Sequence, residues 1–251
     1  MTQPKIEQRW LVLPDLHLPN HDVKALKQVN EWVCSEKWDG ILQLGDFMDF
    51  PTLHSSSKTN LRRQEDSGSF ADDYELGREI IEGWRETHKG KIVILEGNHD
   101  YRIECLIDAF PKLQGSLEVP KGLDFKGYKV DWVKSWSESK FYKIGKANYI
   151  HGWYANTNHT MTHAVKFGFG KCLFYGHTHD CECKSFQQLG QRDTWVAQSL
   201  GHLTDEKKLA KQYTKARPNN WQQAVTEFRF MADGTFQYFI CRMIKGRLVV
   251  P

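Results

Sequence analysis

The sequence predicts an α/β fold in which two β-sheets are flanked by helices, and three observations carry this prediction. Apolar, strand-like segments alternate with amphipathic, helix-like segments between residues 10 and 95. Short β-like segments dominate from residue 123 onward. No repeat, low-complexity tract or Pro/Gly/Ser linker divides the 251 residues, so we expect one domain over residues 1–251.

The first half of the chain is expected to form a βαβα series. Short apolar runs predict strands at 10–13, 40–44 and 91–95, with a helix over 21–37 between the first two. Ser69 is a suitable N-cap for a second helix. This helix would present four apolar side chains on one face: Phe70, Tyr74, Ile81 and Trp84.

The second half is expected to consist mainly of strands. The segments that predict them are 128–133, 141–144, 147–150, 172–175, 194–198 and one run on either side of the turn at 232–234. Two polar stretches, 55–63 and 204–220, are expected to be surface loops or short helices.

Composition excludes several classes of protein. With 40% hydrophobic and 26% charged residues the chain can bury a core, so general disorder is excluded. The longest apolar runs are far shorter than the roughly 20 residues of a membrane span, and we expect a cytoplasmic protein with six reduced cysteines. The net charge of +3 permits an anionic partner without requiring one.

Side chains of metal-binding types follow five of the predicted strands. They are Asp15 and His17, then Asp46 and Asp49, then Asn98, His99 and Asp100, then His151, and finally His177 and His179. Ligands bind at the carboxyl ends of strands in α/β folds, so these residues can converge although they are distant in sequence. Each motif alone is also compatible with turn capping, but their joint, ordered occurrence favours a functional site.

In this order the motifs resemble those of the calcineurin-like metallophosphoesterases, and the compact chain is similar to small bacterial or bacteriophage members. The family series D-x-H, G-D-x-x-D, G-N-H-[DE], a lone His and G-H-x-H lies within residues 10–180. The resemblance implies a four-layer sandwich of two packed mixed sheets with helices on both outer faces. It also implies two cation sites that share Asp46, one with Asp15, His17 and His179, the other with Asn98, His151 and His177.

The activity implied by this resemblance is hydrolysis of a phosphodiester or phosphomonoester by a metal-bridged hydroxide. Nitrogen and oxygen ligands without thiolates suit two divalent transition-metal ions, with Mn preferred over Fe, Zn or Ni. In the family the histidine equivalent to His99 donates a proton to the leaving oxygen, and Asp49 orients it. Asp100 would not bind metal itself but would hold the metal-binding residues in position.

One position departs from the family pattern. Phe50 stands where members acting on phosphoproteins have an arginine that binds phosphate. This difference makes a phosphoprotein substrate less favoured, and it predicts activity on an aryl diester at least equal to that on the monoester. The resemblance of the compact chain to small bacterial or bacteriophage members implies a nucleotide or nucleic-acid substrate. Phe50 either packs, which we favour, or stacks on a base. The possible substrate-binding residues are Phe50, His54, Arg62 and Arg63.

Two alternative functions remain open, a phosphoprotein phosphatase and a non-catalytic metallophosphoesterase-like binding module. Binding modules of this type lose metal ligands or the donor histidine, whereas Asp46, Asn98 and His99 are present here, so an enzyme is favoured. His159 and His163 have a helical spacing that can bind metal, but the filled two-metal set favours a packing or surface role for them. A phosphate ester is the expected partner, without a membrane.

Overall fold

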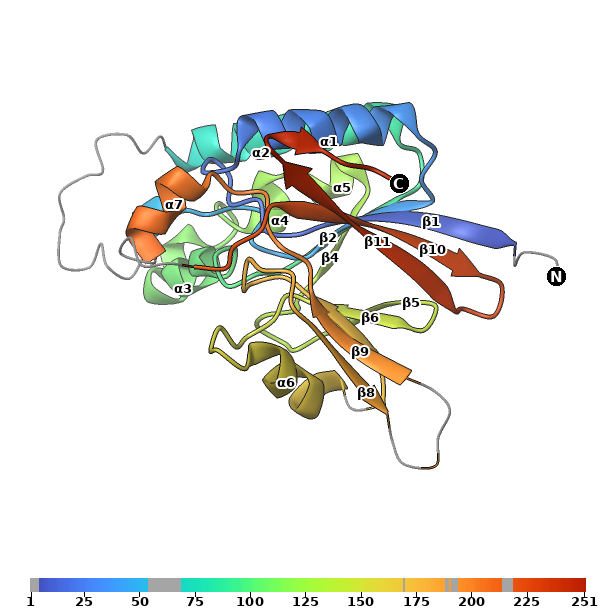
Figure 1. Cartoon of the computed structure of the whole chain (residues 1–251). Helices are drawn as coiled ribbons and strands as arrows, with labels where there is room; N and C mark the ends of the chain where they lie inside the picture. Colours follow the sequence, from blue (N-terminus) through green and yellow to red (C-terminus); the bar gives the residue numbers. More distant parts are fainter. Residues whose placement is uncertain (1–4, 54–68, 169, 188–189, 191–193, 214–218) are drawn as a thin grey trace.

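The computed structural model describes residues 5–53, 69–168, 170–187, 190, 194–213 and 219–251 (Figure 1). Within them, two mixed β-sheets pack face to face, and helices cover both outer faces. The predicted α/β architecture is therefore confirmed, including the layer order that the resemblance implies.

The larger sheet has seven strands in the order β12-β11-β10-β1-β2-β3-β4. They are β1 (Ile6–Leu13), β2 (Gly40–Gln43), β3 (Lys91–Leu95), β4 (Val130–Val133), β10 (Ala224–Met231), β11 (Phe236–Ile244) and β12 (Arg247–Leu248). Strands β1 to β4 run parallel, whereas β10 pairs antiparallel with β1. The carboxyl ends of β1, β2 and β3 consequently lie along one edge of the molecule.

The smaller sheet has five strands in the order β5-β6-β7-β9-β8. They are β5 (Tyr142–Ile144), β6 (Ala147–Ile150), β7 (Cys172–Tyr175), β8 (Cys183–Gln187) and β9 (Thr194–Ser199). The three central strands are parallel, and the two edge strands are antiparallel to their neighbours.

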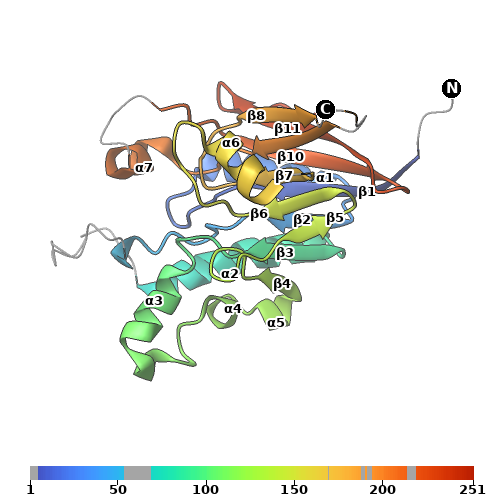
Figure 2. The same cartoon turned by 90° about the horizontal axis from the view of Figure 1, so that it is seen from below.

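Helices cover the outer face of each sheet (Figures 1 and 2). The seven-stranded sheet carries α1 (Val23–Ser35), α2 (Phe70–Thr87), α4 (Val119–Gly122) and α5 (Phe125–Tyr128). The five-stranded sheet carries α6 (His159–His163), which continues into a π-helical turn, η4 (Ala164–Gly168). Helices α3 (Arg102–Ala109) and α7 (Glu206–Tyr213) lie beside the ends of the central strands (Figure 1).

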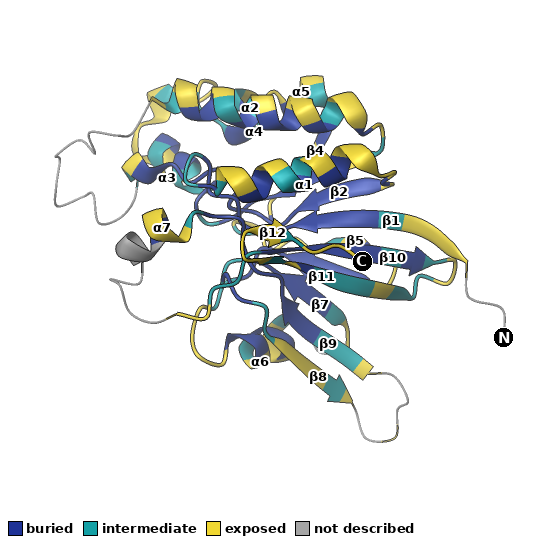
Figure 3. Ribbon diagram, turned by 45° about the horizontal axis from the view of Figure 1, so that its top comes forward, coloured by how far each residue is buried: buried dark blue, intermediate teal, exposed yellow. Residues whose placement is uncertain are grey.

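Strand β1 shows why its sequence is a continuous apolar run. Leu11 and Leu13 point toward the helices, whereas Trp10 and Val12 point into the layer between the sheets, because successive side chains alternate across a strand. All four are buried, and Figure 3 shows part of β1 in the dark blue of buried residues. Central strands of a layered fold lack a solvent face, so their sequences do not alternate with polar residues.

Helix α2 begins at the predicted cap. The Ser69 hydroxyl accepts the backbone N–H of Asp72 at 3.2 Å, and the Asp72 carboxylate accepts the N–H of Ser69 at 2.7 Å. This reciprocal capping box satisfies two donors that the first helical turn leaves free. Tyr74, Ile81 and Trp84 are buried on the predicted face.

Some boundaries and two edge strands differ from the prediction. Tyr128 ends helix α5, so the strand that was expected over 128–133 begins at Val130. The sequence pattern missed β8 and β12, both of which lie at sheet edges where exposed side chains weaken the apolar signal. Among the described residues, no helix is long and apolar enough to cross a membrane.

Candidate metal centre

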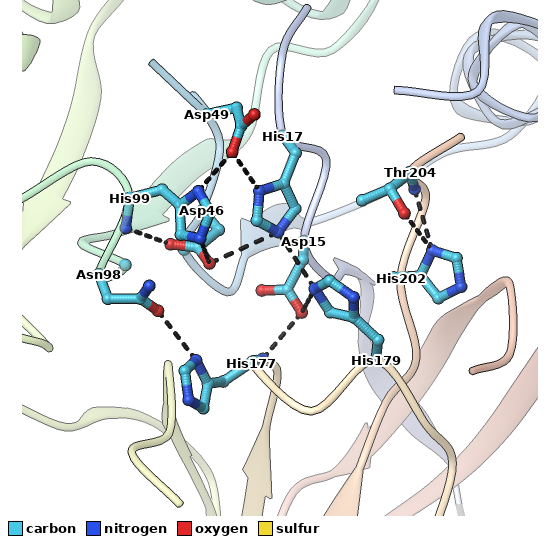
Figure 4. A network of polar contacts seen from close by, with 12 residues as sticks. Asp15, His17, Asp46, Asp49, Asn98, His99, His177, His179, His202 and Thr204 are labelled. Carbon is cyan, nitrogen blue, oxygen red and sulfur yellow. Dashed lines mark hydrogen bonds and ion pairs between the residues drawn. The ribbon is translucent and has the colours of Figure 1, made fainter. Parts of the chain in front are cut away.

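The five motifs meet at one place, at the ends of β1, β2, β3, β6 and β7. Figure 4 shows Asp15, Asp46, Asn98 and His177 there. The parallel strands of each sheet point the same way, and the packing of the sheets brings both sets of ends together. Asp15, Asp46, Asp49, His99 and His151 are buried there.

Asp15, His17 and His179 form the first group of potential metal ligands. The two Nε2 atoms of His17 and His179 face each other at 3.1 Å. His179 Nε2 lies 3.9 Å from Asp15 Oδ2. Imidazole nitrogens and a carboxylate oxygen at these separations can hold one metal ion.

Asp46, His151 and His177 form the second group, and Asn98 lies within it. The Asn98 Oδ1 atom is 2.9 Å from His151 Nε2 and 2.9 Å from His177 Nδ1. This set also consists of nitrogen and oxygen ligands without a thiolate, and it can hold a second cation.

One carboxylate oxygen connects the two groups. Asp46 Oδ2 lies 3.5 Å from His17 Nε2 in the first group and 3.4 Å from His151 Nε2 in the second. Burial alone would raise the pKa of Asp46, but the neighbouring His151, His99 and His17 hold it well below its usual range. Asp46 is therefore an ionised carboxylate with an oxygen placed between two ligand sets.

Hydrogen bonds fix which nitrogen of two histidines faces the centre. His17 Nδ1 lies 3.1 Å from Asp49 Oδ1, and His151 Nδ1 lies 2.9 Å from the carbonyl oxygen of Leu44. Both acceptors require a proton on Nδ1, so in the neutral form of each ring the Nε2 lone pair is directed at the centre. Such outer hydrogen bonds are typical of metal-binding histidines.

Several observations fit cations at this place. Asp15 Oδ1 is buried and has no hydrogen-bond partner among the described residues. Burial raises the pKa of Asp15 to about 7, a cost that an adjacent cation would remove. Burial also lowers the pKa of His177 to about 3, which keeps its imidazole in the neutral, metal-binding form near pH 7.

The backbone at the centre is in an unusual conformation. His17, Asp46, His177 and His179 all have positive φ values, between 50° and 67°. A left-handed conformation is costly for residues with a Cβ atom, and it persists where surrounding contacts impose it. Gly176 adds a close approach, because a Cβ atom there would lie 2.8 Å from Asp15 Oδ1. The chain holds these ligands in place at a cost in backbone strain.

His99 and Asp49 form a pair beside the two ligand groups. His99 Nδ1 makes a short hydrogen bond with Asp49 Oδ1, the same oxygen that His17 contacts. His99 Nε2 lies 3.9 Å from Asp46 Oδ2. Burial opposes ionisation of Asp49, but the hydrogen bonds from His17 and His99 hold its pKa well below its usual range. Burial lowers the pKa of His99 to about 4, although Asp46 and Asp49 oppose this shift.

Asp100 lies behind the ligands and binds backbone. Its two oxygens accept the N–H groups of Gly97 at 2.9 Å and Met48 at 2.9 Å. Asp100 thereby ties the loop after β3 to the loop after β2, which carries Asp46 and Asp49.

Phe50 packs, which is the interpretation that the sequence favoured. Its side chain is fully buried, with the ring centroid 6.0 Å from Phe70 and 5.5 Å from Tyr74 in edge-on contacts. Phe50 therefore belongs to the core beneath α2 instead of contacting a substrate. The other three possible substrate-binding residues, His54, Arg62 and Arg63, lie outside the described residues.

The sequence reasoning missed three polar residues at the centre. Asn20 donates to Asp49 Oδ2 at 2.6 Å, and Arg102 contacts both Asp49 and His99. The ring of buried His202 lies 5.2 Å from that of His179 (Figure 4). The sequence could have indicated Arg102, because it follows His99 by three residues at the start of a helix, a spacing that brings side chains together. Nothing local in the sequence distinguishes His202.

The two α6 histidines are buried, and their ring nitrogens form hydrogen bonds with other groups of the protein. His163 Nε2 accepts the N–H of Trp153 at 2.9 Å, and His163 Nδ1 donates to the carbonyl oxygen of His159 at 2.8 Å. His159 Nε2 lies 2.8 Å from Asp180 Oδ2 and 3.4 Å from Glu182 Oε2. This third group also has ligand-type atoms, but hydrogen bonds from Thr178, Ser199 and Asn220 already reach Asp180.

A cavity of about 680 Å³ opens above the centre. Its floor includes His17, Asp46 and His99. Its walls are formed by the loop after β6, the G-H-x-H loop and the segment before β10, through residues such as Asn156, Thr157, Glu182, Asn219, Asn220 and Trp221.

Comparison with known proteins identifies phage relatives. No protein-family model matches the chain. The chain is 29% identical over 237 residues to the Gene 54 protein of Mycobacterium phage L5 and 26% identical over 236 residues to the Gene 54 protein of Mycobacterium phage D29. Each alignment spans 86% of this chain and 87% of the relative.

Similar solved structures include three Vps29 proteins. Vacuolar Protein Sorting 29 from Cryptosporidium parvum has a TM-score of 0.49 and 14% identity, with 98% of this chain and 97% of that chain covered. Vps29 from Chaetomium thermophilum has a TM-score of 0.41, 12% identity and coverages of 93% and 97%. A single mutant of Vps29 from Entamoeba histolytica has a TM-score of 0.39, 15% identity and coverages of 93% and 98%. All three TM-scores are below 0.5. The fold is therefore assigned from the strand order and register of this chain and not from these similarities.

Proposed function

We propose that this protein is a metal-dependent phosphoesterase with two metal ions per active site. The observation that carries the proposal is the position of Asp46 Oδ2, 3.5 Å from His17 Nε2 and 3.4 Å from His151 Nε2. One buried oxygen thus belongs to two ligand sets. A structural metal site would need one closed set and would gain nothing from a second.

The residues divide into two ligand sets with one member in common. Asp15, His17, Asp46 and His179 would hold one ion, and Asp46, Asn98, His151 and His177 the other. The mixture of imidazole, carboxylate and amide ligands suits divalent transition metals, and we propose Mn, with Fe, Zn and Ni as alternatives. When bound, such a pair of ions polarises phosphoryl oxygens and makes hydroxide available near neutral pH.

His99 is the proposed proton donor to the leaving oxygen. Its Nε2 atom lies beside the shared carboxylate at 3.9 Å, and Asp49 binds its Nδ1 proton. The ionised Asp49 stabilises the doubly protonated ring, and the negative phosphoryl group of a bound substrate would favour that form further. This contribution opposes the low pKa that burial imposes on His99 in the free protein.

The cavity walls support a substrate with a polar, uncharged group such as a nucleoside. Asn156, Asn219 and Asn220 supply amides that can pair with sugar or base edges, and half-buried Trp221 supplies an aromatic face. The described residues that line this cavity include Glu182 but no lysine or arginine. A long polyanion along these walls is therefore disfavoured relative to a nucleotide.

Metal reconstitution and a substrate panel test the proposal. The protein is stripped with a chelator, reloaded with Mn²⁺, and measured for metal content and hydrolysis of nitrophenyl monoester, nitrophenyl diester, nucleotides and DNA or RNA. We expect two Mn²⁺ per chain, with activity that is lost on chelation and restored by Mn²⁺. Two bound ions without hydrolysis of any ester would support a binding module. No more than one ion in fully reloaded, active protein would exclude the two-metal site.

A further inference from the structure

Arg102 places a guanidinium group directly beside the proposed proton donor. It is the first residue of α3, one turn after His99. Its Nη1 atom donates to the carbonyl oxygen of Asp49 at 2.7 Å and lies 3.6 Å from Asp49 Oδ1. Its Nη2 atom lies 3.1 Å from His99 Nε2. The side chain is 16% exposed, whereas Asp49 is fully buried.

We propose that Arg102 is the phosphate-binding cation of this site, and this inference rests on the proposed phosphoesterase function. The residue after the G-D-x-x-D motif cannot take that role here, because the Phe50 side chain is fully buried between Phe70 and Tyr74. Arg102 brings a planar donor group to the same motif from a different element, through its bond to the Asp49 carbonyl.

The position of the guanidinium relative to the shared carboxylate supports this role. His99 Nε2 is 3.1 Å from Arg102 Nη2 on one side and 3.9 Å from Asp46 Oδ2 on the other. One ring atom therefore separates the arginine from the oxygen at which the two ligand sets meet. In this proposal, a phosphoryl group bound next to that oxygen would place a non-bridging oxygen near Nη2.

Substrate binding would then change the partner of Nη2. In the free protein Nη2 contacts His99 Nε2, the atom that must face the leaving oxygen during proton transfer. When Nη2 turns to a phosphoryl oxygen, His99 Nε2 becomes available to the leaving group. Nη1 stays bound to the Asp49 carbonyl, so the guanidinium turns about an anchored nitrogen.

This role alters the substrate preference that the sequence predicted from Phe50. A guanidinium group contributes most to the substrate with the greater phosphoryl charge, which is the monoester. Arg102 therefore offsets the missing arginine, and we expect the monoester to be hydrolysed at a rate comparable to the diester in the wild type. The advantage of a diester should emerge only when Arg102 is removed.

The test compares Arg102→Gln, Arg102→Lys and the wild type, all loaded with Mn²⁺, and uses inorganic phosphate as the probe. Calorimetry measures phosphate affinity, elemental analysis measures metal content, and thermal unfolding verifies the fold. We expect Arg102→Gln to weaken phosphate binding by about 10-fold or more with Mn²⁺ content unchanged. Arg102→Lys should retain part of the affinity, because it keeps the charge without the planar fork. Exposed Arg247→Gln on β12 removes the same charge as a matched control and should leave affinity unchanged.

Kinetics on paired nitrophenyl esters provide the second readout. Arg102→Gln should lower kcat/KM for the monoester more than for the diester. Unchanged phosphate affinity with equal losses on both esters would overturn the proposal and leave Arg102 as a residue that only positions His99. The phosphate measurement does not require turnover. If two Mn²⁺ ions bind but no ester is hydrolysed, the phosphoesterase proposal fails while the binding test still decides the role of Arg102.

Discussion

Two histidine-rich regions of this protein use the same side chain in opposite ways. In the metal centre, the Nε2 atoms of His17 and His179 face each other at 3.1 Å, and the buried Asp15 Oδ1 has no hydrogen-bond partner among the described residues. On α6, His163 accepts the backbone N–H of Trp153 and donates to the carbonyl oxygen of His159. In the first region, this potential ligand atom is left without a hydrogen bond. In the second region, protein groups provide the hydrogen bonds of the ring nitrogens.

The difference shows that spacing alone does not identify a metal-binding histidine. His177 and His179 are two residues apart, and His159 and His163 are four apart, and both spacings occur in metal sites. What distinguishes them is the partner of each ring nitrogen. A histidine whose two nitrogens are occupied by backbone groups contributes to folding, while one with a lone pair directed at other ligands is available to a cation.

The strongest way to break the comparison is Asp46→Asn, because the two ligand groups of the metal centre meet at this residue. We expect the variant to lose both metal ions together and to lose activity by at least about 10³-fold, the loss expected for a preorganised electrostatic group. Metal analysis and ester hydrolysis measure the two effects. Exposed Asp131→Asn on β4 is the matched control. Loss of only one ion would show that Asp46 does not join the sites.

On α6, the expected effect is on stability and not on metal. Burial lowers the pKa of His163 to about 4 from 6.5, even though the bond to the His159 carbonyl and the charge of Asp180 favour protonation. The neutral ring therefore contributes stability that is fully present above pH 6.5. As the pH falls toward 4, the unfolded chain takes up a proton on this histidine that the folded chain excludes. The free energy of unfolding therefore decreases by up to about 3 kcal/mol.

His163→Gln tests this expectation, because an amide can still accept the Trp153 N–H but does not titrate in this range. Denaturant unfolding from pH 7 to pH 4 should show a smaller loss of stability on acidification in the variant than in the wild type. Metal content at pH 7 should be equal in both. Parallel pH profiles for the two proteins would show that His163 is not a buried neutral histidine.

His99 lies in the metal centre, but we assign it to proton transfer and not to metal binding. It therefore tests whether a histidine in this region can have a role other than that of a ligand. His99→Asn should cost about 10²-fold more on an alkyl or nucleotide ester than on a nitrophenyl ester, because an alkoxide must be protonated as it leaves. Metal content should not change. Asp49→Asn should show a weaker form of the same selectivity. Equal losses on both ester types, or lost metal, would assign His99 a structural or ligand role.

The smallest effect is expected for His159→Gln. Asp180 accepts hydrogen bonds from Thr178, Ser199 and Asn220, so we expect the group of His159, Asp180 and Glu182 to act as a polar network behind the G-H-x-H loop. Mn²⁺ content should stay at two per chain. A wild type with three ions and a variant with two would show that this third group also binds metal.

The sequence by itself determined the order of the strands along the chain, the cap of α2 and the motif that follows each central strand. These features are local, because an apolar run, a capping serine or a glycine before a ligand acts within a few residues. The edge strands β8 and β12 were missed for the same reason, since their pairing depends on neighbours in the sheet and not on their own apolar content.

Only the tertiary structure decided which atoms face one another. His17 and His179 are 162 positions apart, and His151 takes its Nδ1 partner from Leu44, 107 positions away. No local pattern encodes the direction of a ring nitrogen, because it depends on hydrogen bonds between segments that meet only after the two sheets pack. The burial of Phe50 and the reach of Arg102 to His99 were decided in the same way, by the packing of α2 and α3 around the centre.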